Sequence, residues 1–451
     1  MFCGIGGFHQ ALSEHADFIF ACDKDEDCRK VYMENYARMP SADIRDTWQN
    51  IGEHDILAAG FPCQPFSKSG SQLGFKDKIR GTLFEVINDI VEVHKPAVIL
   101  LENVKNLGTH DSGNTLSIVR GALQDQDYDV KEYYYSPHDF GIPQIRERIF
   151  IVGLHKDKVK NYAQFKGPEK QQLAYSVEDI KENDLKKSDF KKYEITTEQK
   201  KIFDHWSKLV KAVLSSGKKF PSPTWSMEFG RTYSLDGKFP LYNRTNKELV
   251  DELKSEGIKA SIRAAKEDLI KLYPAYIRNL KGPIPEWKRR FIENNRKFWK
   301  ENSNLVSKGW LKKTRTFNET NQKLEWHVGK DAKCEDDYDI MKWMIHLRPS
   351  GIRVSKLDHI PALVAIAQIP IIGPWGRKIT PREAANAQSF KPDFKLHERD
   401  SVAYKQLGNS VNVEVARAII NEILKLDINQ KEVVVPDVEI TMMGRHVDFI
   451  E

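Results

Sequence analysis

The sequence predicts an α/β protein whose central sheet is mostly parallel. Within the first 155 residues, short apolar segments alternate with stretches of helical periodicity. Continuous apolar segments are typical of strands that are buried on both faces, and a helix between two such strands brings them side by side in parallel. The chain of 451 residues is about three times as long as a typical single domain, so we expect it to divide into two parts.

Four segments are predicted to be strands because each is short, continuously apolar and bounded by turn-forming residues. They are FIFACD (18–23), DILAAGF (55–61), AVILLEN (97–103) and RIFIVGL (148–154). Two helices between them are predicted from apolar residues at helical spacing, over 25–36 and 82–93. Further along the chain, we expect helices near 197–215, 246–272 and 285–300.

Glycine-rich FCGIGGF (2–8) and Asp23 are placed where an α/β sheet binds ligands, beyond the carboxyl ends of its strands. The glycines permit a tight turn and a close approach of the backbone to a ligand at a helix start. Asp23 ends the first predicted strand and is placed to accept hydrogen bonds from ribose hydroxyls. The structural alternatives are a glycine turn without a ligand and an aspartate that caps a helix.

Cys63 and Glu102 follow or end two successive predicted strands. Cys63 lies between two prolines in GFPCQPFSKSG (60–70), and Glu102 lies in LLENV (100–104). Neighbouring parallel strands are about 4.8 Å apart, so a thiol and a carboxyl at adjacent strand ends can reach one small substrate ring. The alternative for Cys63 is a small buried apolar residue.

Two arginines and one asparagine complete the candidate site. Arg146 and Arg148 in FGIPQIRERIF (140–150) have a spacing of two, which on a strand directs both side chains to one face. Surface ion pairs are the structural alternative. In YKQLGNSVNVEVARAI (404–419), we expect a Gly-Asn turn that leads into a packed helix, with Asn409 at its beginning.

Composition excludes several classes of protein. The five cysteines have irregular spacings without a CxxC pair, which argues against a disulfide framework and a zinc cluster. No run of eighteen apolar residues and no signal peptide is present, so we expect a cytoplasmic protein without a membrane partner.

Positive charge is concentrated in one segment. Residues 281–330 contain 13 Lys and Arg against 5 Asp and Glu, a local charge of +8 in a chain whose net charge is +6. Trp287, Trp299, Trp310 and Trp326 are interleaved with these cations, a mixture that suits phosphates and bases. The alternative is a solvated basic face.

In its ordered motifs, the chain resembles the DNA (cytosine-5)-methyltransferases, which depend on S-adenosylmethionine. The motifs are FCGIGGF, Asp23, ADI (42–44), FPCQPFS, RGTLF (80–84), ENV (102–104), QIRER (144–148), TPREAANAQSF (380–390) and GNSV (408–411). They cover residues 1–155 and about 350–425. The resemblance implies a Rossmann-like methyltransferase domain and a large, variable target-recognition domain.

The resemblance also implies roles for individual residues. Cys63 would be the nucleophile that adds to carbon 6 of a flipped-out cytosine, Glu102 would bind ring nitrogen 3, and Arg146 and Arg148 would hold Glu102 and the base carbonyl. The loop 64–77 would close over the base. The implied cofactor-binding residues are Phe2, Gly4, Ile5, Gly6, Gly7, Asp23, Lys24, Asp43, Ile44, Pro62, Leu83, Asn409 and Ser410.

By the same resemblance, the chain divides into a catalytic domain, a target-recognition region, a closing helix and a tail of unknown role. Their predicted bounds are 1–155, 156–400, 401–426 and 427–451. The implied partner is double-stranded DNA, with a cognate restriction endonuclease encoded nearby. The alternatives are a transfer RNA methyltransferase and a DNA-binding relative without catalysis.

The sequence departs from the family pattern at two places. Asn386-Ala387 precedes Gln388 where the family has a different pair, and only Met1 precedes FCGIGGF. Because a glycine turn is usually held by a full strand, we expect the natural protein to begin a few residues earlier.

Overall fold

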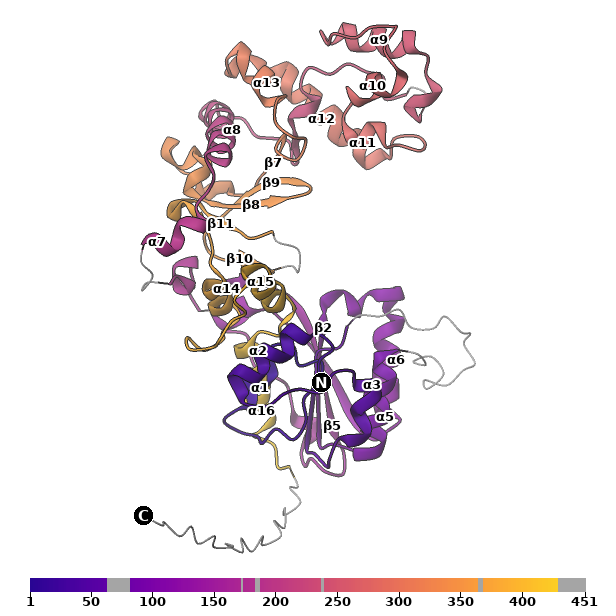
Figure 1. Cartoon of the computed structure of the whole chain (residues 1–451), viewed down its shortest axis with the longest axis vertical. Coiled ribbons are helices and arrows are strands. Elements are labelled where there is room, and N and C mark those ends of the chain that lie inside the picture. Colours follow the sequence, from indigo (N-terminus) through magenta and orange to yellow (C-terminus); the bar gives the residue numbers. More distant parts are fainter. Residues whose placement is uncertain (63–81, 172, 183–186, 237–238, 364–367, 429–451) are drawn as a thin grey trace, which may run out of the picture.

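The computed structural model describes residues 1–62, 82–171, 173–182, 187–236, 239–363 and 368–428. The molecule is elongated (Figure 1). One end contains a four-stranded sheet, a second sheet lies in the middle, and a group of helices forms the other end. Cys63, the loop 64–77 and nearly all of the predicted tail 427–451 lie outside the described residues.

The first sheet has the strand order β1-β2-β5-β3. Its strands are β1 (Ile56–Ala59), β2 (Val98–Val104), β3 (Tyr128–Tyr135) and β5 (Arg148–His155). The pair β1–β2 is parallel, as predicted, with α5 (Leu83–His94) between the two strands in the sequence. By contrast, β5 is antiparallel to both β2 and β3. The α/β class is therefore confirmed, but the expectation that most pairs are parallel is wrong for the described strands.

The orientation of β5 has a simple cause in the connection that precedes it. Between β3 and β5 the chain forms only a short 3-10 turn at Pro137–Phe140 and the two-residue strand β4 (Gln144–Ile145). A parallel connection needs a crossover, usually a helix, whereas a short connection returns the chain antiparallel. The apolar pattern of 148–154 revealed the burial of this strand and not its direction.

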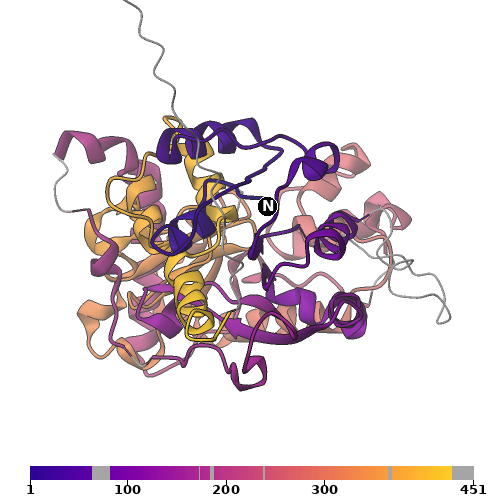
Figure 2. The same ribbon diagram turned by 90° about the horizontal axis from the view of Figure 1, so that it is seen from below.

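Alternate residues of the first sheet pack on two different cores, which explains why its strands are continuously apolar. On β2, Val98 and Leu100 contact the core that includes α1 (Gly7–Leu12), α2 (Glu26–Tyr36) and α16 (Val413–Ile423). Ile99 and Leu101 contact the opposite core, which includes α5 and α6 (Asn114–Gln124). Figure 2 shows the yellow α16 and the purple α5 and α6 on opposite sides of the strands.

The predicted strand 18–23 is not formed. Cys22 makes only an isolated bridge with Ser41, and its carbonyl accepts a hydrogen bond from Cys3 N at 2.9 Å. A strand needs a continuous ladder with a neighbour, and residues 18–20 have none among the described residues. Conversely, β3 was not predicted, because YDVKEYYY mixes charged and aromatic residues instead of forming an apolar run.

The second sheet has six short strands in the order β12-β11-β8-β9-β7-β6. They are β6 (Thr224–Trp225), β7 (Lys323–Trp326), β8 (Met344–Arg348), β9 (Gly351–Ser355), β11 (Ile371–Ile372) and β12 (Arg377–Lys378). The helix α8 (Thr197–Ser215), which agrees with the predicted bounds, packs on this sheet through Phe203 and Trp206. Two smaller elements, α3 (Ile44–Thr47) and α7 (Lys187–Phe190), lie elsewhere.

Between β6 and β7 the chain forms a helical insert, residues 226–322. Its helices are α9 (Asn246–Ser255), α10 (Lys266–Lys271), α11 (Ala275–Arg278), α12 (Glu286–Asn302) and α13 (Lys308–Thr314). The insert has its own core, which includes Leu249, Leu253 and Tyr273. The predicted helix 246–272 is divided in two, because Gly257 adopts a positive φ of 73° after α9.

The last helices return to the first sheet. They are α14 (Pro381–Ala387), α15 (Asp400–Asn409) and α16. Residues such as Ile379 and Phe390, which the predicted bounds assign to the recognition region, pack in the same core as α1. Asn409 was expected to begin a helix but instead ends α15, and the cap of α16 is Asn412, whose side chain accepts a hydrogen bond from Val415 N.

A short parallel bridge joins the two regions beside the QIRER motif. The strand β10 (Ile360–Pro361) pairs with β4, and Ile360 N donates to Pro143 O at 2.8 Å. The segment between β9 and β11 of the second sheet is therefore held against the segment that contains Arg146.

Candidate active site

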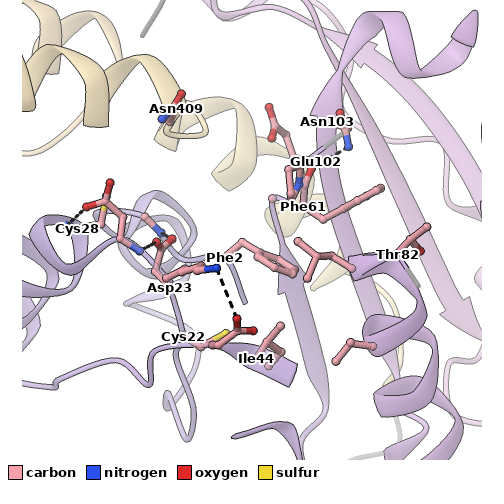
Figure 3. Close-up of a pocket in the computed structure, with 18 of the residues that line it drawn as sticks. Phe2, Cys22, Asp23, Cys28, Ile44, Phe61, Thr82, Glu102, Asn103 and Asn409 are labelled. Atoms are coloured by element: carbon pink, nitrogen blue, oxygen red, sulfur yellow. Dashed lines mark hydrogen bonds and ion pairs between the residues drawn. The ribbon is translucent and has the colours of Figure 1, made fainter. Parts of the chain in front are cut away.

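A cavity of about 950 Å³ lies at the carboxyl ends of β1 and β2. Figure 3 shows Glu102 and Phe61 at these strand ends, with Asp23 and Ile44 across the cavity. The predicted site residues that line it are Phe2, Gly4, Asp23, Lys24, Asp43, Ile44, Pro62, Leu83, Glu102, Arg146, Arg148 and Asn409. Segments that are far apart in the sequence thus meet in one place, as expected for ligands of an α/β sheet.

Pro62 is the last described residue before Cys63, and it lines the cavity. Asn103 fixes the backbone at this point, because its Nδ2 donates to Phe61 O at 2.8 Å while its Oδ1 accepts from Val104 N at 2.8 Å. This bond ties the end of β2 to the segment after β1. Sequence reasoning did not single out Asn103, although its position directly after Glu102 was a usable signal.

The glycine turn is held by Asp23. Gly4 N donates to Asp23 Oδ2 at 2.7 Å, and Asp25 N donates to Oδ1 at 2.9 Å. Gly4 and Gly6 have positive φ angles of 51° and 93°, which glycine adopts without strain. The helix cap at α2 is Asp25, whose side chain accepts from Cys28 N, so Asp23 itself is not the cap.

Four predicted cofactor residues do not line the cavity: Ile5, Gly6, Gly7 and Ser410. Ile5 is buried in the core. A Cβ on Gly6 would lie 2.3 Å from the Tyr36 ring, and one on Gly7 would lie 2.8 Å from Ser410 Oγ. These residues therefore shape the turn and its contact with the end of α15 without facing the cavity.

Asp43 forms the acidic opposite wall. It caps α3, and its carboxylate accepts hydrogen bonds from Arg45 N at 3.1 Å and Arg45 Nε at 3.0 Å. These bonds with Arg45 lower the pKa of Asp43 to about 2. Asp43 therefore stays ionised throughout the physiological range.

Glu102 and Arg148 form an ion pair at the inner end of the cavity. The distance from Arg148 Nε to Glu102 Oε1 is 3.1 Å, and the Glu102 residue is only 8% exposed. Burial raises the pKa of Glu102, although the positive charges of Arg148 and Arg146 oppose the shift. Burial likewise lowers the pKa of Arg148. A carboxyl with a raised pKa is suited to hold or donate a proton.

Arg146 connects three segments of the chain around this pair. Its guanidinium donates to Ser410 O at 2.9 Å and to Leu363 O at 3.5 Å, and its backbone N donates to Ser136 Oγ at 2.8 Å. Its Nε is buried without a hydrogen-bond partner among the described residues. Burial and the charge of Arg148 lower the pKa of Arg146 to about 9.

Arg146 and Arg148 both line the cavity, but the strand alternation that was expected to direct both side chains there is not observed. Arg146 lies between β4 and β5 instead of within one strand with Arg148, which begins β5. Its orientation is therefore set by its hydrogen bonds to distant carbonyls and not by strand alternation.

Two classes of feature are absent from the described part of the chain. No group of three or more His, Cys, Asp and Glu residues there is arranged to hold a metal ion. Nor does any helix within these ranges have the length and apolar character needed to cross a membrane.

The tryptophans of the basic segment differ from their expected role. Trp310 is only 3% exposed and stacks on His205, and Trp299 stacks on Phe229. Trp326 packs against the core of the second sheet, which also contains Trp310. Of the four, Trp287 alone is exposed, at 53%.

Comparison with known proteins gives one family over nearly the whole chain. The family model for the C-5 cytosine-specific DNA methylases matches residues 1–425. The type II methyltransferase M.AluI of Cellulosimicrobium cellulans is 29% identical, over 95% of this chain and 91% of its own. M.BanI of Aneurinibacillus aneurinilyticus is also 29% identical, over 95% and 96%. Among solved structures, a putative DNA modification methyltransferase encoded within an E. coli prophage is 19% identical with a TM-score of 0.46, over 94% and 97%.

Proposed function

Because the chain belongs to the family of C-5 cytosine-specific DNA methylases, we propose that it methylates carbon 5 of a flipped-out cytosine in a specific duplex DNA sequence, with Cys63 as the covalent nucleophile. The enzyme class is that of its type II relatives. The observation that supports the specific chemistry is the buried Glu102–Arg148 pair, which faces the cavity directly beside the segment that leads to Cys63.

Cys63 and Glu102 would act together on the ring. Addition of the Cys63 thiolate to carbon 6 forms a C–S bond and moves an electron pair toward carbon 5, which makes that carbon nucleophilic. Glu102, whose pKa is raised by burial, holds a proton at ring nitrogen 3 and stabilises the charge that accumulates there. Loss of the carbon 5 proton after methylation then breaks the C–S bond and frees the thiolate.

Arg146 and Arg148 would position the acid and the base carbonyl. Arg148 is already paired with Glu102, while Arg146 has a buried Nε without a partner among the described residues. An unpaired buried donor is costly unless a ligand completes its bonds. The carbonyl oxygen of the flipped cytosine is an acceptor of the required kind, and extrusion of the base costs a few kcal/mol.

The outer part of the cavity suits S-adenosylmethionine. The carboxylates of Asp23 and Asp43 lie on its wall, and a Cβ at Gly4 would meet no atom within 4 Å, so the turn leaves open space there. When bound, this cofactor supplies the electrophilic methyl group. We propose that Asp23, Asp43, Phe2, Ile44 and Leu83 hold it, with Gly6, Gly7 and Ser410 acting through the turn.

We also propose that residues 156–400 include the target-recognition region and that a cognate endonuclease belongs to the same restriction-modification system, in the cytoplasm. The type II names of the relatives support this context. The helical insert and most of the second sheet pack in cores of their own, while Met344 of β8 and Ile372 of β11 pack in the core of the first sheet.

The decisive experiment maps 5-methylcytosine in the genome of methylation-free bacteria that express this protein. We expect methylation at one short sequence and none with Cys63→Ala. Duplex DNA that contains 5-fluorocytosine should trap the wild type covalently, because fluorine does not leave as a proton, and should not trap the variant. Methylation of transfer RNA in place of DNA, or turnover by Cys63→Ala, would contradict the proposal.

A further inference from the structure

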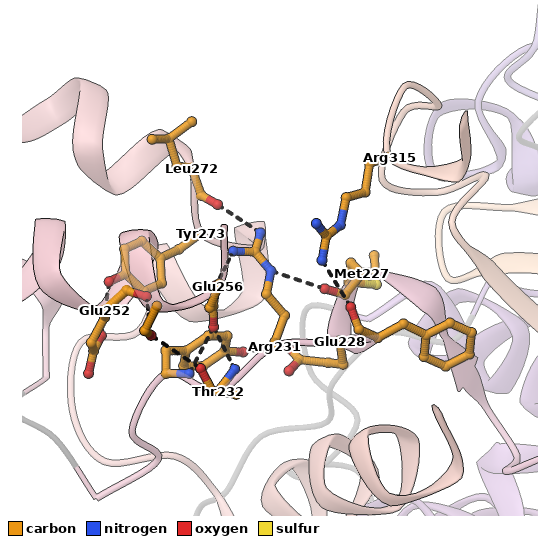
Figure 4. A network of polar contacts seen from close by, with 12 residues as sticks. Met227, Glu228, Arg231, Thr232, Glu252, Glu256, Leu272, Tyr273 and Arg315 are labelled. Carbon is orange, nitrogen blue, oxygen red and sulfur yellow. Dashed lines mark hydrogen bonds and ion pairs between the residues drawn. The ribbon is translucent and has the colours of Figure 1, made fainter. Parts of the chain in front are cut away.

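Five arginines of the helical insert form ion pairs with carboxylates, whereas two half-buried lysines, Lys288 of the insert and Lys323 at the start of β7, form none within the described ranges. Figure 4 shows Arg231 between Glu256 and the carbonyls of Met227 and Leu272, and the Arg231–Glu256 distance is 2.6 Å. Further pairs are Arg244–Glu252, Arg278–Glu319, Arg289–Asp236 and Arg296–Glu228. The excess positive charge of residues 281–330 therefore belongs mainly to its lysines.

Lys288 and Lys323 both lie close to one aromatic ring, that of Tyr276. Lys288 is in the first turn of α12, Lys323 begins β7, and each Nζ lies 5.9 Å from the centroid of the Tyr276 ring. Lys288 also lies over Trp287 at 5.4 Å, and Lys323 lies over Trp225 at 5.8 Å. Within the described ranges, neither lysine forms an ion pair with a carboxylate.

Packing alone does not account for this arrangement. A lysine stem often covers an aromatic ring while its ammonium reaches water, which explains the contact of Lys323 with Trp225 across the β6–β7 pair. It does not explain why two cations share Tyr276. Burial lowers the pKa of Lys323, Glu319 opposes the shift, and the charge of Lys288 adds to it.

The nearby carboxylate is already engaged. Glu319 accepts hydrogen bonds from Ala275 N at 3.0 Å and pairs with Arg278 at 3.3 Å. Glu319 is held by these partners, and an external anion beside the two ammonium groups would reduce the repulsion between them. Trp287, beside Lys288, presents an exposed flat ring to the same region.

The pair lies near the border of the insert that faces the first sheet, because the shared ring belongs to α11 at that border (Figure 1). In both Figure 1 and Figure 2 the insert is on the side of α5 and α6. Along the long axis of Figure 1, the second sheet lies between the insert and the first sheet, where the ends of β1 and β2 line the cavity, so a duplex with one base in the cavity would meet the insert at some distance from that base.

We propose that Lys288 and Lys323 bind backbone phosphates of the DNA that flanks the recognised sequence. The contact supplies affinity without sequence information, because phosphates are the same at every base pair. The inference rests on the proposed function, since it takes duplex DNA as the substrate.

The test compares Lys288→Gln/Lys323→Gln with a matched control, Lys247→Gln/Lys254→Gln. The control removes the same charge from α9, where both lysines are exposed and form no ion pair within the described ranges. Equilibrium binding is measured against salt concentration on a long duplex and on a duplex trimmed to the recognised sequence. On the long duplex, the test variant should lower the slope of log K against log salt by about 0.9 for each lost contact.

The control variant should keep the wild-type slope, and Lys288→Arg/Lys323→Arg should restore it. On the trimmed duplex, the test variant should bind like the wild type. Equal slopes for test and control variants would overturn the proposal, as would a loss that persists on the trimmed duplex. Unchanged thermal unfolding of the test variant shows that it folds. If the wild type neither binds nor methylates any duplex, it is the proposed function that fails and not this assignment.

Discussion

Two buried glutamates, one in each region of the molecule, differ in the number of hydrogen bonds and ion pairs that the protein provides to their carboxylates. Glu228 in the helical insert is fully buried, and it accepts hydrogen bonds from Tyr233 and Tyr276 on one oxygen and from Arg296 Nε at 2.9 Å on the other. Glu102 has one ion pair, to Arg148, among the described residues, and it faces a cavity. Both carboxyls meet an arginine, yet their surroundings differ.

The effect on the arginines shows the same difference. Burial opposes ionisation of Arg296, but the charge of Glu228 and the hydrogen bonds to it outweigh burial and raise the pKa of Arg296. Near Glu102, burial outweighs the carboxylate, so the pKa values of Arg146 and Arg148 are lowered. Both sites contain an arginine nitrogen that is buried without a hydrogen-bond partner among the described residues, Arg296 Nη2 and Arg146 Nε, so the difference lies in the carboxylates and in the cavity. Glu228 is saturated by the protein, whereas Glu102 is incompletely paired beside a cavity, where a ligand can complete its bonds.

The largest effect is expected from Glu102→Gln. The amide cannot hold the proton that ring nitrogen 3 requires, so we expect single-turnover methyl transfer to fall by about 10²–10⁴. Glu228→Gln is the matched control, and its folded fraction should transfer methyl groups at nearly the wild-type rate. If Glu102→Gln transferred methyl groups at a rate within a factor of a few of the wild type, Glu102 would not have the catalytic role that distinguishes it from Glu228.

The next effect concerns stability, and here we expect the larger loss at the Glu228 site and the smaller one at the Glu102 site. Arg296→Met leaves the buried Glu228 carboxylate without its cation, so we expect a loss of about 3–5 kcal/mol in the free energy of unfolding of the insert. Urea denaturation followed by tryptophan fluorescence measures it. The double variant Glu228→Gln/Arg296→Met should recover part of the loss. If the single variant loses less than Arg148→Met, Glu228 is not the better integrated group.

The smallest effect is a loss of stability in acid that we expect from one buried histidine in each region, so that here the two regions behave alike. Burial lowers the pKa values of His9 and His205 to about 4. His9 is stacked between Phe18 and Tyr36, and His205 is stacked on Trp310. Between the folded-state pKa of about 4 and the unfolded-state pKa of about 6.5, each histidine binds more protons in the unfolded chain than in the folded protein. The free energy of unfolding should therefore fall as pH decreases from about 6.5 to about 4.

Chemical denaturation at several pH values measures this acid loss. His9→Phe and His205→Phe should each make the decline less steep, and the two substitutions should add because the rings lie in different cores. A decline as steep in both variants as in the wild type would assign the acid sensitivity to other groups.

Prediction from sequence succeeded where burial imposes a simple pattern. The strands β1 and β2 are covered on both faces, so their apolar runs were visible, and α5, α8 and α12 have regular apolar periodicity. Prediction failed where the formation or direction of a strand depends on a neighbouring segment. Segment 18–23 has an apolar sequence but forms only an isolated bridge, between Cys22 and Ser41, among the described residues, and the direction of β5 depends on the preceding connection.

The candidate site shows the same limit. The proximity of Glu102 and Arg148 was implied by the family resemblance, and in the structure it results from the pairing of β2 with β5. The contacts of Arg146 with Leu363 and Ser410 join residues 217 and 264 positions apart, a separation at which no local pattern is informative. The tryptophans of the basic segment were misinterpreted because composition cannot separate a buried ring from an exposed one. The roles of Cys63 and the cofactor residues stay predictions.

The position of the helical insert has a consequence for how such proteins diverge. The insert leaves the second sheet after β6 and returns at β7, and these strands are hydrogen-bonded neighbours, with Thr224 opposite Leu324. Loop closure costs rise only slowly with length, so this junction can accommodate longer or shorter chains without a change in the host sheet. Phe298 and Trp310 limit that freedom, because they pack in the core of the sheet. Insertions and deletions acquired during evolution should therefore accumulate in α9, α10 and α11, which pack mainly on each other.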